Sequence, residues 1–212
     1  MKFKNRVCEL LHQDHLATIA LTRPLEALVA RYQDDAPKLG HSDSVGTLSD
    51  VSVGVRNEIG RHFSFEEDYV FPYLAEIGAP AMGILLREEH EILRPLGAAL
   101  STMTQRAQQE RTNAEEWAAL CGVGLEYCEG IRIHAQKEEA GLLPLLEENM
   151  EEAIEAPLCK LRRYWKSRAS WLRLLDLSAQ ARNQDPLTPS TSVIDLDQKR
   201  RQRDIPWSEE PV

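Results

Sequence analysis

A repeated segment with polar residues at fixed positions constrains the fold of this chain more than any other feature. Residues 59–74 read IGRHFSFEEDYVFPYL and residues 131–146 read IRIHAQKEEAGLLPLL, so six of the sixteen positions are identical. Two unrelated segments of average composition would share about one residue. The identical positions include a histidine, two adjacent glutamates and a proline. The chain therefore contains an internal repeat, and the repeat carries ionisable side chains.

A shorter match precedes each copy. The segment LLHQDH ends at His15 and the segment LLREEH ends at His90, so these two histidines align as the histidines of the longer segments do. The repeated unit is a helix with one histidine followed by a helix with the pattern HxxxEE. Two such hairpins packed about a pseudo-twofold axis would direct all four histidines toward one volume.

Helical periodicity extends through most of the chain, and no segment alternates like a β-strand. We expect four long helices, at about residues 3–33, 42–75, 80–109 and 113–152. Short connections between them predict an all-α, up-down-up-down four-helix bundle with a C-terminal helical extension and a flexible tail.

The expected domains follow from this pattern. The bundle takes residues 1–152, an amphipathic basic helix takes residues 153–182, and the tail takes residues 183–212. Residues 158–179 carry an apolar stripe opposite a basic face. This stripe is expected to pack on the protein itself, with a dimer or protein partner, or an anionic surface, as the alternatives.

Composition excludes several classes of protein. A net charge of −9 and a pI near 5.2 argue against a general nucleic-acid binder. No apolar run approaches the roughly 18 residues of a membrane span, and the first residues lack the features of a signal peptide. The four cysteines form no CxxC pair and are expected to be reduced thiols that pack in the core. These features predict a cytoplasmic protein.

The spacing HxxxE places an imidazole and a carboxylate on one helix face, because residues four apart are separated by only about 40° and 6 Å. The predicted interior set is His15, His62, Glu66, His90, His134 and Glu138. The second glutamate of each pair, Glu67 or Glu139, lies about 140° away around the helix. We expect these two side chains, and Glu89, to face solvent, with orientation of a ligand histidine as the alternative.

Six such side chains would be costly to bury without partners, and metal coordination would satisfy them. The alternative is a core with scattered histidines that each find an ordinary hydrogen-bond partner. If Glu66 and Glu138 both bridge, two metal ions each receive two histidines and two carboxylate oxygens. Such mixed ligands with open coordination positions suit non-haem iron, or manganese, better than structural zinc.

Two further side chains lie near the predicted set. His12 is three residues before His15, and it is either a fifth histidine ligand or a surface residue. Tyr127 precedes His134 by two turns and shares its face, either as a core residue or as a hydrogen-bond donor to a metal-bound ligand.

These residues and spacings, over about residues 5–150, resemble the haemerythrin-like, or HHE cation-binding, family. The resemblance implies a four-helix bundle that holds two non-haem iron ions joined by an oxo or hydroxo bridge. By the same resemblance, Glu66 and Glu138 bridge the ions and the four histidines are terminal ligands. The oxygen carriers of the family have a second histidine one turn after the one on the third helix, where this chain has Arg94. They also have an aspartate five residues after the last histidine, where this chain has Glu138 at four.

The missing carrier pattern argues against simple reversible oxygen transport. The predicted function is a di-iron protein that binds or senses dioxygen, nitric oxide or related oxidants, with a small diatomic molecule or peroxide as its ligand. The alternative is a di-iron oxidoreductase that turns over oxygen, peroxide or nitric oxide, and the residues leave open whether the chain is an enzyme.

Overall fold

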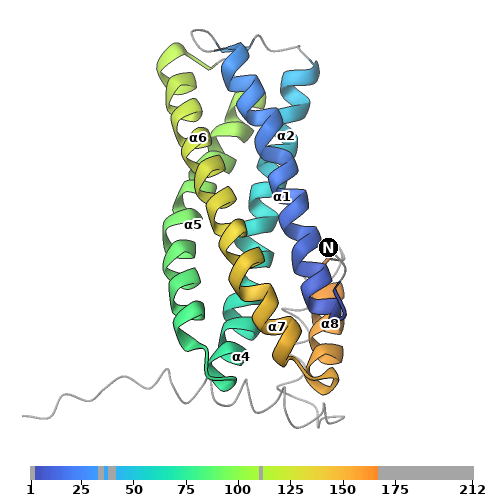
Figure 1. The fold of residues 1–212 in the computed structure, drawn as a ribbon. Coiled ribbons are helices and arrows are strands. Elements are labelled where there is room, and N and C mark those ends of the chain that lie inside the picture. The colour runs from blue at the N-terminus through green and yellow to red at the C-terminus, as the bar shows by residue number, and fades with distance from the viewer. Residues whose placement is uncertain (1–2, 33–35, 38–41, 110–111, 167–212) are drawn as a thin grey trace, which may run out of the picture. The chain divides into compact units, whose positions relative to one another are not determined.

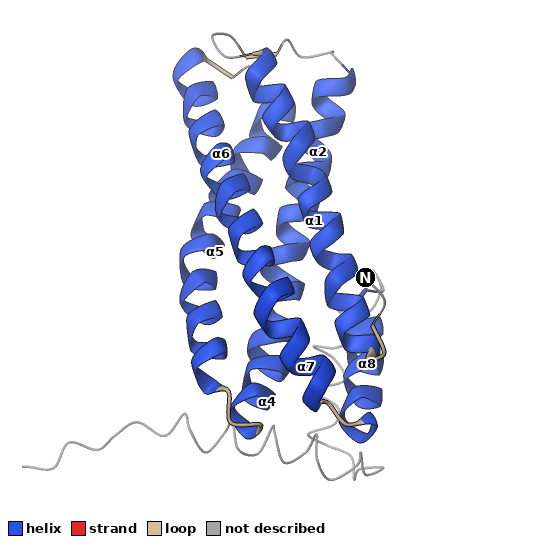
Figure 2. Ribbon diagram, in the orientation of Figure 1, coloured by secondary structure: helices blue, strands red, loops and turns tan. Residues whose placement is uncertain are grey.

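The structure is a computed structural model that describes residues 3–32, 36–37, 42–109 and 112–166. Within these ranges all regular structure is helical and no strand occurs (Figure 2). The chain divides into two compact units, Met1–Asn149 and Met150–Val212. The predicted all-α fold class is confirmed. The predicted tail, and most of the extension that precedes it, lie outside the described residues.

The first unit contains four long helical segments, two of which are interrupted by π-helical turns labelled η. The first segment is α1 (Arg6–Arg31) and the third is α5 (Pro80–Gln109). The second segment consists of α2 (Ser42–Asn57), η1 (Glu58–His62), α3 (Phe63–Phe65), η2 (Glu66–Val70) and α4 (Phe71–Glu76). The fourth segment consists of α6 (Ala114–Lys137), η3 (Glu138–Leu142) and α7 (Leu143–Asn149).

Successive segments run in opposite directions, as Figure 1 shows for α1, α2, α5 and α6. The helix α1 contacts α2 and α6, and α5 contacts the same two helices, so the four segments close into a ring around a common interior. This is the predicted up-down-up-down bundle. The predicted third helix ends where α5 ends, and the other predicted boundaries differ from the observed ones by up to three residues.

Local capping explains where several helices begin. The side chain of Asn5 accepts hydrogen bonds from the backbone amides of Val7 (2.8 Å) and Cys8 (3.2 Å). Asn113 and Glu116 form a reciprocal capping box at the start of α6. The turn between α4 and α5 contains Gly78 at φ +83°, a conformation that glycine adopts without steric cost.

The π-helical turns follow the internal repeat. Both η2 and η3 begin at the first glutamate of the HxxxEE pattern, so the same local distortion occurs at equivalent positions of the two copies. Turns of this kind are rare and often occur at functional sites. The turn η1, which ends at His62, has no such counterpart, because the equivalent residues lie within the regular helix α6.

Apolar layers enclose the middle of the bundle. One cluster of buried residues lies toward the end of the bundle where α1 ends and α6 begins, and consists of Leu25, Val29, Val51, Val55, Phe63, Leu93, Leu100, Tyr127, Cys128 and Ile131. Toward the other end, further side chains are buried, including Cys8, Leu11, Val70, Leu74, Leu86, Leu142 and Leu146. Full burial of one such large apolar side chain is worth about 1.5–3 kcal/mol. These layers therefore stabilise a bundle whose centre is polar.

The second unit contains α8 (Glu152–Lys166) among its described residues. The remainder of the predicted basic helix, residues 167–182, lies outside the described part. Among the helices of the described ranges, none combines the length and apolar character that a membrane span requires.

Candidate metal centre

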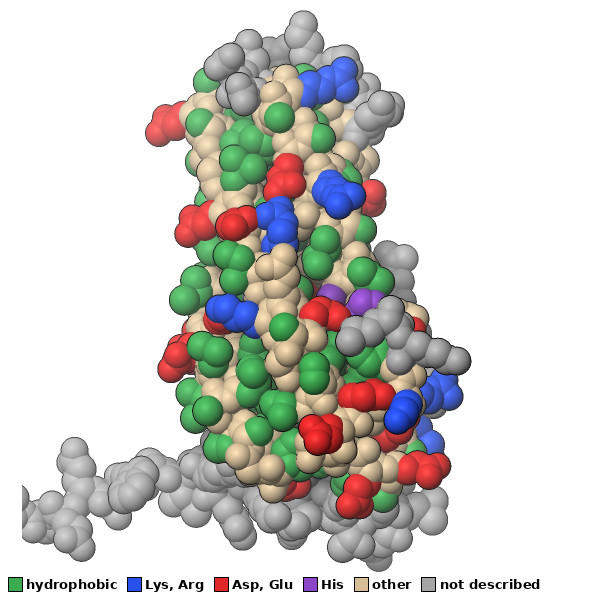
Figure 3. Space-filling model, viewed as in Figure 1, with side chains coloured by type: hydrophobic (Ala, Val, Ile, Leu, Met, Phe, Trp, Pro, Cys, Tyr) green, Lys and Arg blue, Asp and Glu red, His purple; other side chains and the backbone are tan. Residues whose placement is uncertain are grey.

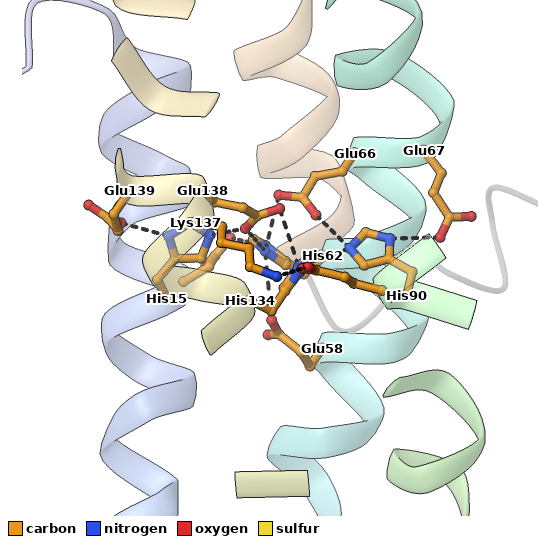
Figure 4. A network of polar contacts seen from close by, with 12 residues as sticks. His15, Glu58, His62, Glu66, Glu67, His90, His134, Lys137, Glu138 and Glu139 are labelled. Atoms are coloured by element: carbon orange, nitrogen blue, oxygen red, sulfur yellow. Dashed lines mark hydrogen bonds and ion pairs between the residues drawn. The ribbon is translucent and has the colours of Figure 1, made fainter. Parts of the chain in front are cut away.

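The structure brings together all six side chains that the sequence predicts for the interior. They form two groups, one of His15, His62, Glu66 and Glu138 and the other of His90, His134 and the same two glutamates. Within each group, one potential ligand atom from each residue lies within 4.8 Å of the others. The two groups share both carboxylates, and Figure 4 shows the imidazole rings converging on them.

All four long helical segments contribute to this centre. His15 lies on α1 and His90 on α5, whereas His62 and His134 lie at or near the ends of η1 and α6. The six side chains are 0–2% exposed. On the face viewed in Figure 3, histidine atoms reach the surface only in a small area beside acidic side chains.

The Glu66 carboxylate lies between the two groups. Its Oε1 atom is 3.2 Å from His62 Nε2, and its Oε2 atom is 3.4 Å from His90 Nε2. One oxygen therefore faces each group, which is the arrangement that a bridging carboxylate requires.

Glu138, in the second copy of the repeat, is arranged in the same way. Its Oε1 atom is 3.2 Å from His134 Nε2, and its Oε2 atom is 2.8 Å from His15 Nε2. Each group thus contains two imidazole nitrogens and one oxygen from each of two carboxylates. The donor set has the composition expected for two ions that share two bridges.

Three of the four imidazole rings also contact a second carboxylate, called an outer carboxylate, through Nδ1, the nitrogen that faces away from the centre. His15 Nδ1 lies 2.6 Å from Glu139 Oε1, His90 Nδ1 lies 2.8 Å from Glu67 Oε1, and His134 Nδ1 lies 2.9 Å from Glu89 Oε2. The expectation that these three glutamates face solvent is wrong. Their contacts agree with the alternative, in which each glutamate orients a histidine. Each glutamate points away from the histidine on its own helix but reaches a histidine on a neighbouring helix.

These outer contacts decide what the centre can bind. An imidazole that donates its Nδ1 proton to a carboxylate carries a lone pair on Nε2, and here Nε2 points inward. His90 Nε2 and His134 Nε2 are 3.0 Å apart, a short separation for two lone pairs. The four oxygens of Glu66 and Glu138 are buried and face the histidine Nε2 atoms at 2.8–3.4 Å. Converging lone pairs and buried anionic oxygens fit a metal cation.

Residues 7–146 match the sequence profile of the Hemerythrin HHE cation binding domain. The match spans 140 of 212 residues (146 − 7 + 1) and includes all six central residues. The chain belongs to this family. The resemblance inferred from the histidine and glutamate spacing is therefore confirmed. No curated protein matches the chain.

Without a metal, the centre of this haemerythrin-family bundle would hold protons instead. Burial alone would lower the pKa of His62, but the charges of Glu58 and Glu66 outweigh it and raise the pKa to about 10. Burial likewise opposes the effect of Glu138 on His134, whose pKa rises to about 9. Burial would raise the pKa of Glu138, but the charge of His134 and hydrogen bonds from the histidines hold it well below its usual range. Metal ions must therefore compete with protons for these nitrogens.

Neither His12 nor Arg94 lies in the central group of six residues. His12 Nδ1 is 2.9 Å from the carboxylate of Glu139, so its ring contacts an outer carboxylate and not the centre. Arg94, at the position of the carriers' additional histidine, bonds to Glu67 (2.6 Å) and to the carbonyl oxygen of Ile59 (2.5 Å). Its guanidinium also lies over the Phe63 ring, 5.6 Å from the centroid. Neither side chain adds a donor to the six.

Cations accompany the outer carboxylates. Arg94 and Arg87 pair with Glu67, Lys137 pairs with Glu89, and His12 pairs with Glu139. Each outer glutamate thus lies beside a positive or protonatable group as well as the histidine whose Nδ1–H it accepts in a hydrogen bond.

Sequence reasoning missed two acidic residues near His62. Glu58 is buried, and its Oε1 atom is 3.7 Å from His62 Nε2. Asp14 Oδ2 is 3.7 Å from His62 Nδ1, longer than the 2.9 Å of the equivalent Glu89 contact with His134. The signal for Glu58 was available, because it precedes His62 by four residues and extends the pattern to ExxxHxxxE.

Tyr127 and Cys128 lie in the same apolar cluster. Tyr127 is 3% exposed, and its hydroxyl has no hydrogen-bond partner among the described residues. Burial, with the charge of Glu58, raises the pKa of Tyr127 well above its usual value, so the phenol keeps its proton. All four cysteines are thiols, and burial raises the pKa of Cys128 to about 12. Their predicted role as packing thiols is supported.

A pocket of about 150 Å³ lies between α5 and α6, and it is lined in part by Met103, Arg106 and Leu120. Met103 is 13 residues beyond His90, or about 20 Å along the helix at 1.5 Å per residue. This pocket is not part of the centre.

Proposed function

We propose that this chain holds two non-haem iron ions at the shared His/Glu centre and uses them to bind or sense dioxygen, nitric oxide or a related oxidant such as peroxide. The observation that carries the proposal is that Glu66 and Glu138 each present one oxygen to each group. Manganese suits the same donors and is the alternative metal.

The roles of the residues follow from their contacts. His15 and His62 would hold one ion, His90 and His134 would hold the other, and the two glutamates would bridge. Glu139, Glu67 and Glu89 would keep the Nδ1 proton on three of the histidines, so that each ring presents its Nε2 lone pair. When bound, the metal pair supplies redox chemistry and open coordination positions for a small molecule.

The position of Arg94 supports a function other than oxygen transport. Its guanidinium is engaged by Glu67 and by the Ile59 carbonyl oxygen, so it contributes no ligand where the carriers have a histidine. One ion then has a protein donor fewer than in a carrier. Water can take the additional open position, and we expect any oxygen adduct to be short-lived.

Metal analysis of protein purified without oxygen tests the proposal. We expect about two iron or manganese ions per chain, because the six donors divide into two equivalent sets. A single tightly held zinc would overturn it. Glu66→Ala and Glu138→Ala should each lower occupancy at both positions, because each removes a bridge. Azide should perturb the ligand-to-metal absorption of the oxidised protein.

Counting turnovers distinguishes the proposed binding or sensing protein from the alternative, a di-iron oxidoreductase. Peroxide or nitric oxide is supplied together with an excess of an electron donor. A single stoichiometric oxidation supports binding or sensing, whereas many turnovers that are lost in His90→Ala identify an enzyme.

We also propose a cytoplasmic location, which the presence of four cysteine thiols supports. Residues 158–179 remain a candidate surface for a protein partner or a dimer, and the structure describes this stretch only as far as residue 166.

A further inference from the structure

The two copies of the repeat differ at one position beside the centre. Glu58 precedes His62 by four residues, and the equivalent residue before His134 is Gly130. Glu58 is 4% exposed, so the first copy carries an additional buried carboxylate. A side chain at Gly130 would have little room, because an added Cβ atom would lie 2.8 Å from Leu93 Cδ2. One half of the centre thus has a carboxylate where the other half has a leucine.

The Glu58 carboxylate reaches the inward side of His62. Its Oε1 atom is 3.7 Å from His62 Nε2, the nitrogen that also faces Glu66 at 3.2 Å. Figure 4 shows Glu58 approaching His62 from the side opposite Glu66. The other oxygen, Oε2, accepts a hydrogen bond from the Thr18 hydroxyl at 2.5 Å. Thr18 therefore fixes the carboxylate in place while Oε1 faces the position that a metal on His62 would occupy.

A small cavity lies beside Thr18, the residue that bonds to Glu58. It has a volume of about 10 Å³, room for about one water-sized molecule. Thr18, Thr22, Tyr127 and Cys128 line it together with leucine and valine side chains. Thr18 thus contacts both the cavity and Glu58. The buried Tyr127 hydroxyl, which lacks a hydrogen-bond partner among the described residues, provides a second polar group for a molecule in this space.

We propose that Glu58 selects which small molecules can bind at the His15–His62 half of the centre. The proposal rests on the proposed function and narrows it. A carboxylate beside an open coordination position repels anions and accepts a hydrogen bond from a neutral molecule. The favoured class is therefore a small, neutral molecule with an O–H or N–H donor, and hydrogen peroxide is the oxidant in that class.

The test compares two variants that separate charge from hydrogen bonding. Glu58→Gln removes the negative charge but keeps an oxygen acceptor, whereas Glu58→Leu removes both and copies the environment of the other half. Glu126→Gln removes one negative charge from an exposed position on α6 and serves as the control. Each protein is loaded with iron, its metal content is measured, and azide is titrated with and without methanol. Methanol is a small neutral O–H donor that does not exchange electrons with the metals.

Both Glu58 variants should bind azide about tenfold more tightly, because a like charge is removed. Methanol should compete with azide in the wild type and in Glu58→Gln. In Glu58→Leu its competition should weaken by about three- to tenfold, because the acceptor is lost. The Glu126→Gln control should match the wild type in both titrations.

Unchanged azide affinity in both variants, with two metals bound, would overturn the selecting role. Loss of metal from both variants would also overturn it, because Glu58 would then be a ligand. A wild type that holds no pair of metals would instead refute the proposed function itself.

Discussion

At the scale of single residues, three of the four central histidines contact different groups with their two ring nitrogens. The Nε2 atoms of His15, His90 and His134 point into the centre, while their Nδ1 atoms contact a glutamate on a neighbouring helix. A carboxylate at Nδ1 fixes the tautomer and the orientation of the ring and makes Nε2 a stronger donor. The outer glutamates therefore belong to the centre although they would touch no metal.

The first prediction concerns one outer glutamate. Glu139→Gln should lower the affinity for metal by about 10- to 100-fold, because His15 loses the acceptor for its Nδ1 proton. The loss should be smaller than in Glu138→Ala, which removes a carboxylate proposed to bridge the two ions. Competition with a chelator measures both effects. Glu148→Gln, an exposed change on α7, is the matched control. Equal affinities for Glu139→Gln and this control would show that the outer contact has no influence on the centre.

At the scale of helices, close packing between segments holds the ligand residues in register. Gly97 on α5 lies where α2, η1 and α6 meet. A Cβ atom added there would lie 2.9 Å from Ile59 Cγ2, 3.0 Å from Tyr127 Cε2 and 3.0 Å from Val55 Cγ1. The absence of a side chain thus lets α5 approach its neighbours closely enough for His90 to reach Glu66 and Glu67.

Exchanging glycine for alanine should have opposite effects at two helical positions. Gly97→Ala gains helix propensity but overpacks a crowded contact, and it should destabilise the protein by about 1–3 kcal/mol. Gly122→Ala on α6 meets nothing within 4 Å, and it should stabilise the protein by about 0.5–1 kcal/mol. Urea unfolding of the metal-free proteins measures both changes. A Gly97→Ala protein as stable as Gly122→Ala would contradict the packing described for α5.

At the scale of the whole bundle, the duplicated sequence produces a nearly symmetric centre. The His15–Glu139 contact in one half corresponds to the His90–Glu67 contact in the other. The symmetry is weakest around His62, where Asp14 is more distant than its counterpart and Glu58 is present without one. Duplication thus accounts for two similar groups of potential metal ligands, and the changes around His62 make one group different.

The stability of the bundle should depend on pH in opposite ways with and without metal. In the metal-free protein the pKa of His62 is raised to about 10 and that of His134 to about 9. Their stabilising contribution is complete below the ordinary histidine pKa of about 6.5 and is lost as pH rises through 9–10. The pKa of Glu138 is lowered, so its contribution is constant over this range. Metal binding displaces the histidine protons and strengthens as pH rises.

The difference in melting temperature between the loaded and metal-free proteins should therefore widen from pH 6.5 to pH 9.5. Thermal unfolding of both forms at a series of pH values checks this. A difference that stayed constant or narrowed would mean that the histidines are not the groups for which metals and protons compete.

The amino-acid sequence by itself determined the four helical segments and the six central residues. Helical periodicity is a local property, and residues four apart share a face whatever surrounds the helix. The repeat then aligned each histidine with its equivalent. Periodicity, with Pro80 in the first turn, predicted the boundaries of α5, and the four-residue spacing assigned His62 and Glu66 to one interior face.

The tertiary structure alone decided which groups meet across helices. The outer glutamates reach histidines on neighbouring segments, and those contacts depend on how each helix is rotated in the bundle and on the π-helical turns at Glu66 and Glu138. A long carboxylate side chain adopts several rotamers, and only its neighbours select one. The cavity beside Thr18 likewise exists only after four segments have packed together, because no single segment contains its walls.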